Sequence, residues 1–183
     1  FVASRLAPMK IRSPLFSVIT VCRNAGGVLG ATMESVRRQS CRDYEYIIVD
    51  GASTDATADS VRSFGDLVTV FVSEPDKGIY DAMNKGVRLA RGQWIYFLNA
   101  NDFLAAGEVL ARTAAQLARR PVAMLAYGDV LHRTGGSEVL FRFDWLNRRN
   151  LRFEHLCHQA VFARRALFER IGAFDERYKV NAD

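Results

Sequence analysis

The sequence predicts an α/β domain with a mostly parallel central sheet flanked by helices. Three observations predict it. Short apolar runs rich in β-branched residues alternate with segments whose apolar residues recur at helical spacing. Four such pairs follow one another between residues 16 and 120, and this alternation is typical of parallel sheets covered on both faces. A polar cluster follows each apolar run, and ligands of such sheets bind beyond the carboxyl ends of the strands.

The first half divides into four predicted strand–helix pairs. We expect strands at residues 16–22, 44–50, 67–73 and 94–99. We expect helices at 28–39, after the Gly-Ala-Ser-Thr-Asp run up to about residue 64, at 78–92 and at 107–119. Ser53 or Thr54 can cap the second helix, and Gly92 ends the third.

The pattern changes after Pro121. Residues 123–143 read as a β-hairpin around the turn Arg-Thr-Gly-Gly-Ser, and an arginine-rich stretch follows. Residues 157–163 predict one more strand, and 164–172 a helix ended by Gly172. Because no linker interrupts the chain, we expect a single domain over residues 1–183. The chain starts without Met and stops without a helix end or polar tail, so we expect truncation at both ends.

Composition limits the classes of function. Hydrophobic residues make up 49% of the 183 residues, enough for one substantial core. The net charge is +5; residues 133–170 carry eight arginines against four acids. This basic part could face anionic lipid, substrate phosphates or water. Nucleic acid is disfavoured, because no basic helix or aromatic–basic strand pattern occurs. Three widely spaced cysteines favour reduced thiols in the cytoplasm, with a disulfide as the alternative.

Three carboxylates stand at predicted strand ends: Asp50, Asp76 and Asp102. The chain has no G-x-G-x-x-G after its first strand, no P-loop and no G-x-S-x-G elbow. A carboxylate at a strand end can bind a base N–H, a ribose hydroxyl or a hard divalent cation. Each one alone could equally cap its own loop. Three on one sheet edge favour a ligand site.

Four segments in order resemble a known family. They are "FSVITVCRNAGG", "YEYIIVDGASTDAT", "SEPDKGIYDAMNKGVRLARGQWIYFLNANDFL" and "CHQAVFARRALFERIGAFDERYKVNAD". Together they are similar to family 2 glycosyltransferases, most of all to the bacterial branch that assembles cell-surface polysaccharides. The resemblance runs from about residue 16 to the last residue. It implies the GT-A (Rossmann-like) fold, with a nucleotide-sugar half at about 16–120 and an acceptor half, a β-hairpin and helix, at about 121–183.

The resemblance implies a nucleotide-diphospho-sugar donor, with a UDP-sugar as the expected one. Asp50 matches the acid that contacts the base, at a strand end outside the core, and Thr20 and Asn24 line the same pocket. Asp76 matches a second base or ribose contact, and Lys77 shapes the loop beneath the nucleotide. Lys77 could equally be a solvated lysine.

The family's metal motif is an acidic D-x-D cluster after the fourth strand, and here the matching residues read Asn99-Ala100-Asn101-Asp102. Mg²⁺ binds through one or two carboxylates together with substrate phosphates and waters. We therefore expect Asp102 to hold Mg²⁺ or Mn²⁺ with the donor diphosphate. Asn99 and Asn101 are expected to contact the nucleotide-sugar, Asn99 by accepting from a ribose hydroxyl.

The resemblance places His158 and Gln159 near the diphosphate and the acceptor, and Asp183 at the position of the catalytic base. His155 and His158 could suggest zinc, but no third ligand accompanies them. A structural histidine bonded to backbone is the other interpretation of His158.

The sequence thus predicts a metal-dependent, inverting glycosyltransferase of surface polysaccharide assembly, with a glycan or lipid-diphosphate acceptor. We expect a cytoplasmic protein, at the inner face of the membrane if the arginine-rich segment (Arg142, Arg148, Arg149 and Arg152) faces lipid. One alternative is a degenerate GT-A module that binds nucleotide-sugar without turnover, favoured by the two asparagines. The other is a sugar nucleotidyltransferase, disfavoured because no Gly-rich loop with Arg and Lys follows the first strand.

Overall fold

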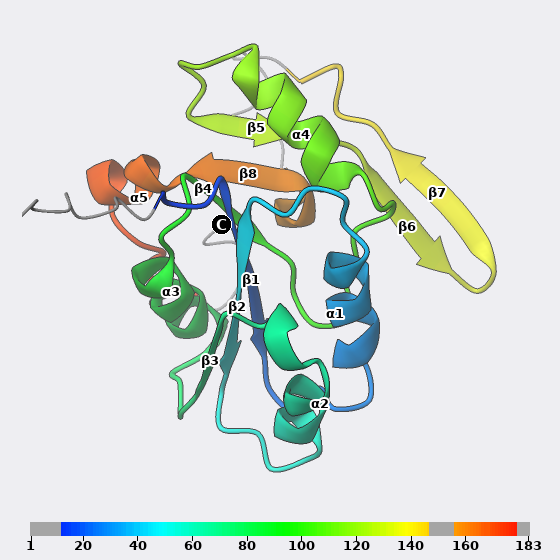
Figure 1. Ribbon diagram of the computed structural model, residues 1–183, viewed down its shortest axis with the longest axis vertical. Coiled ribbons are helices and arrows are strands. Elements are labelled where there is room, and N and C mark those ends of the chain that lie inside the picture. Colours follow the sequence, from blue (N-terminus) through cyan, green and yellow to red (C-terminus); the bar gives the residue numbers. More distant parts are fainter. Residues whose placement is uncertain (1–11, 147–155, 179–183) are drawn as a thin grey trace, which may run out of the picture.

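The computed structural model describes residues 12–146 and 156–178 (Figure 1). Its strands are β1 (Phe16–Cys22), β2 (Tyr44–Asp50), β3 (Val70–Ser73), β4 (Trp94–Phe97), β5 (Leu125–Tyr127), β6 (Val130–Thr134), β7 (Ser137–Phe141) and β8 (Val161–Arg164). Its α-helices are α1 (Leu29–Arg37), α2 (Thr57–Ser63), α3 (Ile79–Leu89), α4 (Val109–Ala118) and α5 (Arg165–Ile171). Two short 3-10 helices are η1 (Gly65–Leu67) and η2 (His158–Ala160).

Six of the strands form one sheet in the order β3-β2-β1-β4-β8-β5. The first four are parallel; β8 joins antiparallel to β4, and β5 joins antiparallel to β8. The prediction of a mostly parallel sheet is therefore confirmed. Strands β1 and β2 have the predicted bounds and are buried along nearly their whole length, as parallel strands covered on both faces should be.

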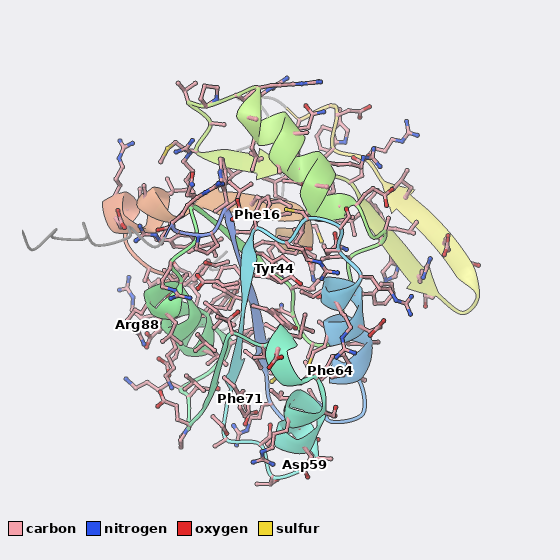
Figure 2. All side chains as sticks on the ribbon, in the orientation of Figure 1. Phe16, Tyr44, Asp59, Phe64, Phe71 and Arg88 are labelled. Carbon is pink, nitrogen blue, oxygen red and sulfur yellow. The ribbon has the colours of Figure 1, made fainter. Side chains whose placement is uncertain are left out.

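Helices cover both faces of this sheet. On one face, α1, α2 and α4 bury residues such as Leu29, Val61 and Leu110 against Val18 and Tyr46. On the other face, α3 buries Tyr80, Ala82 and Met83 against Ile19, Ile47 and Ile95, and Phe168 and Phe174 pack beside them. Figure 2 shows this division: Phe64, next to α2, and Arg88, on α3, lie on opposite sides of the strands.

The predicted hairpin at residues 123–143 is only partly correct. Residues 125–127 form β5, which pairs with β8 in the main sheet, while β6 and β7 form a separate two-stranded sheet. Gly128 and Asp129 separate β5 from β6. All of β7 is exposed, and the β6–β7 hairpin extends from the body of the molecule (Figure 1). The predicted strand at 157–163 is likewise shorter, because its first part forms η2.

Among the described residues, no helix has the length and hydrophobicity needed to cross a bilayer.

A buried carboxylate fixes the amino-terminal edge of the sheet. Glu45 is 2% exposed. Its Oε1 accepts from Ser17 Oγ at 2.6 Å and from the backbone N–H groups of Arg91 and Gly92 at 2.5 and 3.0 Å. Arg91 Nε donates to Oε2 at 2.9 Å. Burial raises the pKa of Glu45, but the bonds from Ser17 and Arg91 outweigh it, so its pKa lies below the usual value. Glu45 thus joins β1, β2 and the turn before β4.

We predict that Glu45→Gln lowers the free energy of unfolding by about 1–3 kcal/mol at pH 7, because the amide NH₂ cannot accept from these donors. A lowered pKa stabilises the fold above the unfolded-state value, and the contribution disappears as pH falls through the lower folded-state value. The wild-type protein should therefore lose stability below about pH 4.5 more steeply than the variant. Urea unfolding from pH 3 to 7 measures both effects.

The control variant is Glu169→Gln, which alters an exposed ion pair with Arg165. It should change the free energy of unfolding by less than about 0.5 kcal/mol. Equal effects of the two substitutions would contradict the role of Glu45.

Candidate functional site

The carboxyl ends of the parallel strands lie together at one edge of the sheet. Strand pairing places Cys22 beside Asp50, and Asp50 beside Ser73. Strand β4 lies on the other side of β1, and the loop 98–108 continues from it. The polar clusters that follow β1, β2, β3 and β4 in the sequence are therefore neighbours in space, as predicted.

Asp50 ends β2 and is fully buried. Its Oδ2 accepts from the Ser53 N–H at 3.0 Å and from Ser73 Oγ at 2.6 Å, and its Oδ1 accepts from Ser53 Oγ. The expectation that Asp50 stands outside the core is wrong, because the residue is fully buried. These donors, together with Cys22 Sγ at 3.9 Å from Oδ1, compensate for the burial. Asp50 thus fixes the start of the loop after β2 through Ser53 and connects it to the end of β3 through Ser73.

The loops after β1 and β2 are tied to each other. Asn24 has the left-handed φ of 51°. Its backbone N–H donates to Ser53 Oγ at 2.7 Å, and its side-chain Oδ1 accepts from the Thr54 N–H at 3.0 Å. The prediction that Ser53 or Thr54 caps the second helix is therefore wrong. That helix begins at Thr57, whose N–H donates to Asp55 Oδ1 at 3.0 Å.

Asp76 faces the loop after β2. A methyl group on Gly51 would collide with the Asp76 carboxylate, which would have to move, and would touch the Arg23 side chain. The missing side chain of Gly51 therefore lets the Asp76 carboxylate approach the end of β2 closely. Asp76 is partly exposed, and its Oδ1 accepts from the Gly78 N–H at 3.0 Å. The predicted pair Asp50 and Asp76 is thus brought together, and Arg23, which we did not predict, lies beside it.

Lysine 85 holds the loop 74–78 from helix α3. Its Nζ donates to the Pro75 carbonyl at 2.7 Å and forms ion pairs with Glu74 at 3.0 Å and Asp81 at 3.5 Å. Asp81 also accepts from the backbone N–H of Lys77, whose side chain is exposed. We did not predict Lys85 as a site residue. The i, i+4 spacing of Asp81 and Lys85, next to an acidic loop, is the signal that could have identified it.

Four predicted residues meet where β4 ends. Asn99 Nδ2 lies 3.0 Å from His158 Nε2, and the side chains of Gln159 and His158 lie close enough to Asp102 to lower its pKa. Burial raises the pKa of Asp102, while Gln159 and the nearby His158 act in the opposite direction. Tyr96 holds the backbone of Gln159 beside β4, because its hydroxyl donates to the Gln159 carbonyl at 2.7 Å.

Asn99 Oδ1 is buried, and no protein group in the described structure bonds to it. Buried polar atoms normally have a partner. A buried carbonyl oxygen with an open lone pair, near the half-buried carboxylate of Asp102, suits a hydroxyl donor or a hard cation. The described residues contain no group of three His, Cys, Asp or Glu that could hold a metal by itself. Water or a bound substrate would supply further ligands to a cation held here by Asp102.

Thr20 lies inside the core and does not reach this edge. It is fully buried, donates to the Leu98 carbonyl at 2.6 Å and bonds to the Tyr46 hydroxyl at 2.9 Å. It therefore fixes the residue just before Asn99. Asp183, His155 and the arginines at 148, 149 and 152 fall outside the described residues.

The model of the family described as Glycosyl transferase family 2 matches residues 17–172. This chain belongs to the family 2 glycosyltransferases.

Relatives and solved structures agree with this family. A PGL/p-HBAD biosynthesis glycosyltransferase of Mycobacterium tuberculosis (strain ATCC 25177 / H37Ra) is 42% identical over 179 residues, covering 93% of this chain and 67% of the relative. The crystal structure of S. aureus TarS 1-349 in complex with UDP superposes with a TM-score of 0.77 at 22% identity, over 91% of this chain and 52% of that one. A mannosyltransferase of Pyrobaculum calidifontis, in complex with GDP-Man and Mn²⁺, superposes with a TM-score of 0.69 at 21% identity. The match covers 94% of this chain and 50% of the mannosyltransferase.

These structures establish that the glycosyltransferase has the GT-A fold, as predicted. The chain spans about half the length of these two solved neighbours.

We predict that Asp50 and Asp76 of this glycosyltransferase differ in their effect on stability. Asp50→Asn should lower the free energy of unfolding by about 1–3 kcal/mol, because a buried amide NH₂ would face serine donors. Asp76→Asn keeps an acceptor for Gly78 in a partly exposed loop and should change it by less than about 0.5 kcal/mol. Thermal and urea unfolding of both variants measure the difference. Equal losses would contradict the structural role of Asp50.

Proposed function

We propose that this protein is an inverting glycosyltransferase. It would transfer a sugar from a nucleotide-diphospho-sugar to a hydroxyl group of a glycan or lipid-linked acceptor in surface polysaccharide assembly. The observation that carries this proposal is the position of Asp76 and Asp102 on loops at the carboxyl edge of a GT-A sheet, with the unpartnered side-chain Oδ1 of Asn99 on the same loop as Asp102. Membership of family 2 supports glycosyl transfer.

The donor site would lie over the loops after β1, β2 and β3. TarS is shown with UDP and with UDP-GlcNAc, and the mannosyltransferase with GDP-Man, which supports a nucleotide-sugar donor here. In this proposal Asp76 contacts the base or ribose, and Asn24 and Lys77 line the same pocket. Asp50 acts by holding Ser53 and Ser73, while Thr20 supports the pocket from the core. We keep a UDP-sugar as the expected donor.

The diphosphate would lie over the end of β4. When bound, Mg²⁺ or Mn²⁺ would supply positive charge against the charge of the departing nucleoside diphosphate. Asp102 would supply its protein carboxylate ligand, and the donor phosphates would supply further ligands, consistent with a site that has one acid. The mannosyltransferase neighbour is shown with Mn²⁺. Asn99 would accept from a donor hydroxyl with its open Oδ1, and Asn101 would lie at the same loop. His158 and Gln159 would orient Asn99 and Asp102.

The acceptor oxygen would form the new bond to the anomeric carbon while the bond from that carbon to the diphosphate breaks. Attack from the face opposite the leaving group inverts the configuration. Asp183 would remove the proton of the acceptor hydroxyl as general base. The arginine-rich segment, including Arg142, would face a lipid diphosphate at the inner surface of the cytoplasmic membrane.

The rival function is a GT-A module that binds a nucleotide-sugar without turnover. The observation that favours it is the presence of amides at Asn99 and Asn101 in place of acids. Activity assays separate the two.

We predict that Asp102→Asn removes the tightening of nucleoside diphosphate binding that Mn²⁺ produces, because no carboxylate remains in the loop after β4. The fold should persist, since asparagine has nearly the shape of aspartate and the Asp102 side chain is only half-buried. Calorimetry with UDP and GDP, with and without Mn²⁺, measures this. Asp76→Asn is the matched control: it should weaken binding about tenfold or more under both conditions, through one lost charged hydrogen bond. If Asp102→Asn keeps the full metal effect, the metal ligands lie elsewhere.

We predict that Asp183→Asn lowers sugar transfer by about 10²- to 10⁴-fold and leaves donor affinity nearly unchanged, as expected for a general base. Transfer of labelled sugar to a lipid-extract acceptor, beside a melting curve for each protein, measures this. A variant that transfers at the wild-type rate would exclude Asp183 as the base. A wild-type protein that binds donor tightly but transfers to no acceptor would support the binding module.

A further inference from the structure

Helix α1 carries a polar stripe on a face that packs against the loop after β4. Thr32, Ser35 and Gln39 are spaced by three and four residues and therefore share one face of the helix and its end. Thr32 and Gln39 are fully buried. In the sequence, Thr32 looks like a member of the apolar stripe formed by Leu29, Met33 and Val36.

Each side chain of this stripe bonds to the backbone of the loop. Thr32 Oγ1 accepts from the Asn101 N–H at 3.1 Å, and Ser35 Oγ accepts from the Leu104 N–H at 3.1 Å. Gln39 donates to the Ala106 carbonyl at 2.7 Å and accepts from the Leu110 N–H at 3.0 Å. The stripe therefore fixes the path of the loop from residue 101 to the start of α4.

The bond to Thr32 occurs where the loop turns most sharply. Asn101 has a φ of 75°, in the left-handed region that non-glycine residues rarely adopt. The next N–H, that of Asp102, donates back to the Asn99 carbonyl at 3.0 Å. Residues 99–102 form this turn, and its conformation sets the direction of the Asp102 side chain. The N–H group that donates to Thr32 belongs to Asn101, a central residue of the turn.

We propose that Thr32 is a positioning residue for sugar transfer, which holds Asn101 in the left-handed turn and thereby directs Asp102 toward the donor diphosphate. This inference rests on the proposed function. Thr32 itself touches no substrate in this arrangement; it acts through the loop backbone. Helix α1 is anchored in the core by Leu29, Met33 and Val36. The Thr32 hydroxyl therefore has a fixed position relative to the sheet, and so does the Asn101 N–H that donates to it.

The test compares Thr32→Val, which keeps the shape and removes the acceptor, with Thr32→Ser, which keeps the acceptor. Thr32→Val should lower kcat for sugar transfer by about 10- to 100-fold, as small misplacements of reacting groups do. Thr32→Ser should remain within about threefold of the wild type. Binding of nucleoside diphosphate without metal should be the same in all three proteins, because the loops around Asp50 and Asp76 are not changed.

Ser17→Ala is the matched control, since Ser17 Oγ is also buried and accepts the Gly92 N–H at 2.8 Å, at the opposite edge of the sheet. This variant should melt earlier than the wild type and keep its kcat. A loss of transfer in Ser17→Ala equal to that in Thr32→Val would show that lost stability alone explains both, and would overturn the proposal.

A double-mutant cycle with Asp102→Asn tests the proposed route of action. If Thr32 acts through Asp102, Thr32→Val should add little to the loss already caused by Asp102→Asn. Losses that multiply would overturn the proposal, as would a Thr32→Val variant with wild-type kcat or a Thr32→Ser variant as poor as Thr32→Val.

Amide hydrogen exchange of Asn101 separates this inference from the proposed function. Protection of the Asn101 N–H should be lost in Thr32→Val and kept in Thr32→Ser, whether or not the protein transfers sugar. If the wild type transfers none, the proposed function fails, and with it the role of Thr32 in transfer. Unchanged protection in Thr32→Val would overturn the positioning role by itself.

Discussion

The parallel pairing of β1 with β2 and β4 is the constraint on which the rest of the structure depends. Every residue of β1 is buried, so its two faces and both edges are occupied by protein. The pairing brings the loops after four strands to one edge, although they are separated by up to about eighty residues in the chain. No single loop forms this site, because its polar side chains come from the loops after several strands.

Helices fix the polar loops at this edge from both faces of the sheet. From one face, α1 holds the loop after β4 through Thr32, Ser35 and Gln39. From the other face, α3 holds the loop after β3 through Lys85. Asp76, Asn99 and Asp102 lie on loops, but the backbones of these loops are bonded to helices anchored in the core. Such an arrangement combines exposed functional groups with restricted motion.

The sequence predicted β1 and β2 with correct bounds, because buried parallel strands are continuous apolar runs with clear ends. The family resemblance named Asn99, Asp102, His158 and Gln159 in separate roles, and the structure brings them together at the end of β4. The sequence did not predict Glu45, Lys85 or the function of Thr32, since their roles depend on backbone groups distant in the chain. It joined β5 to β6 in one hairpin strand, because periodicity does not show that Gly128 and Asp129 turn the chain between two sheets.

The β6–β7 hairpin has a consequence for how such a protein can diverge. Within residues 12–146 and 156–178 its strands pair only with each other, and every residue of β7 is exposed. A two-stranded sheet in water is only marginally stable alone, so the global fold gains little from its side chains. Mutations accumulate most freely where they cost least in folding free energy. Evolution can therefore vary this hairpin extensively while the sheet, and the polar edge that it supports, stay unchanged.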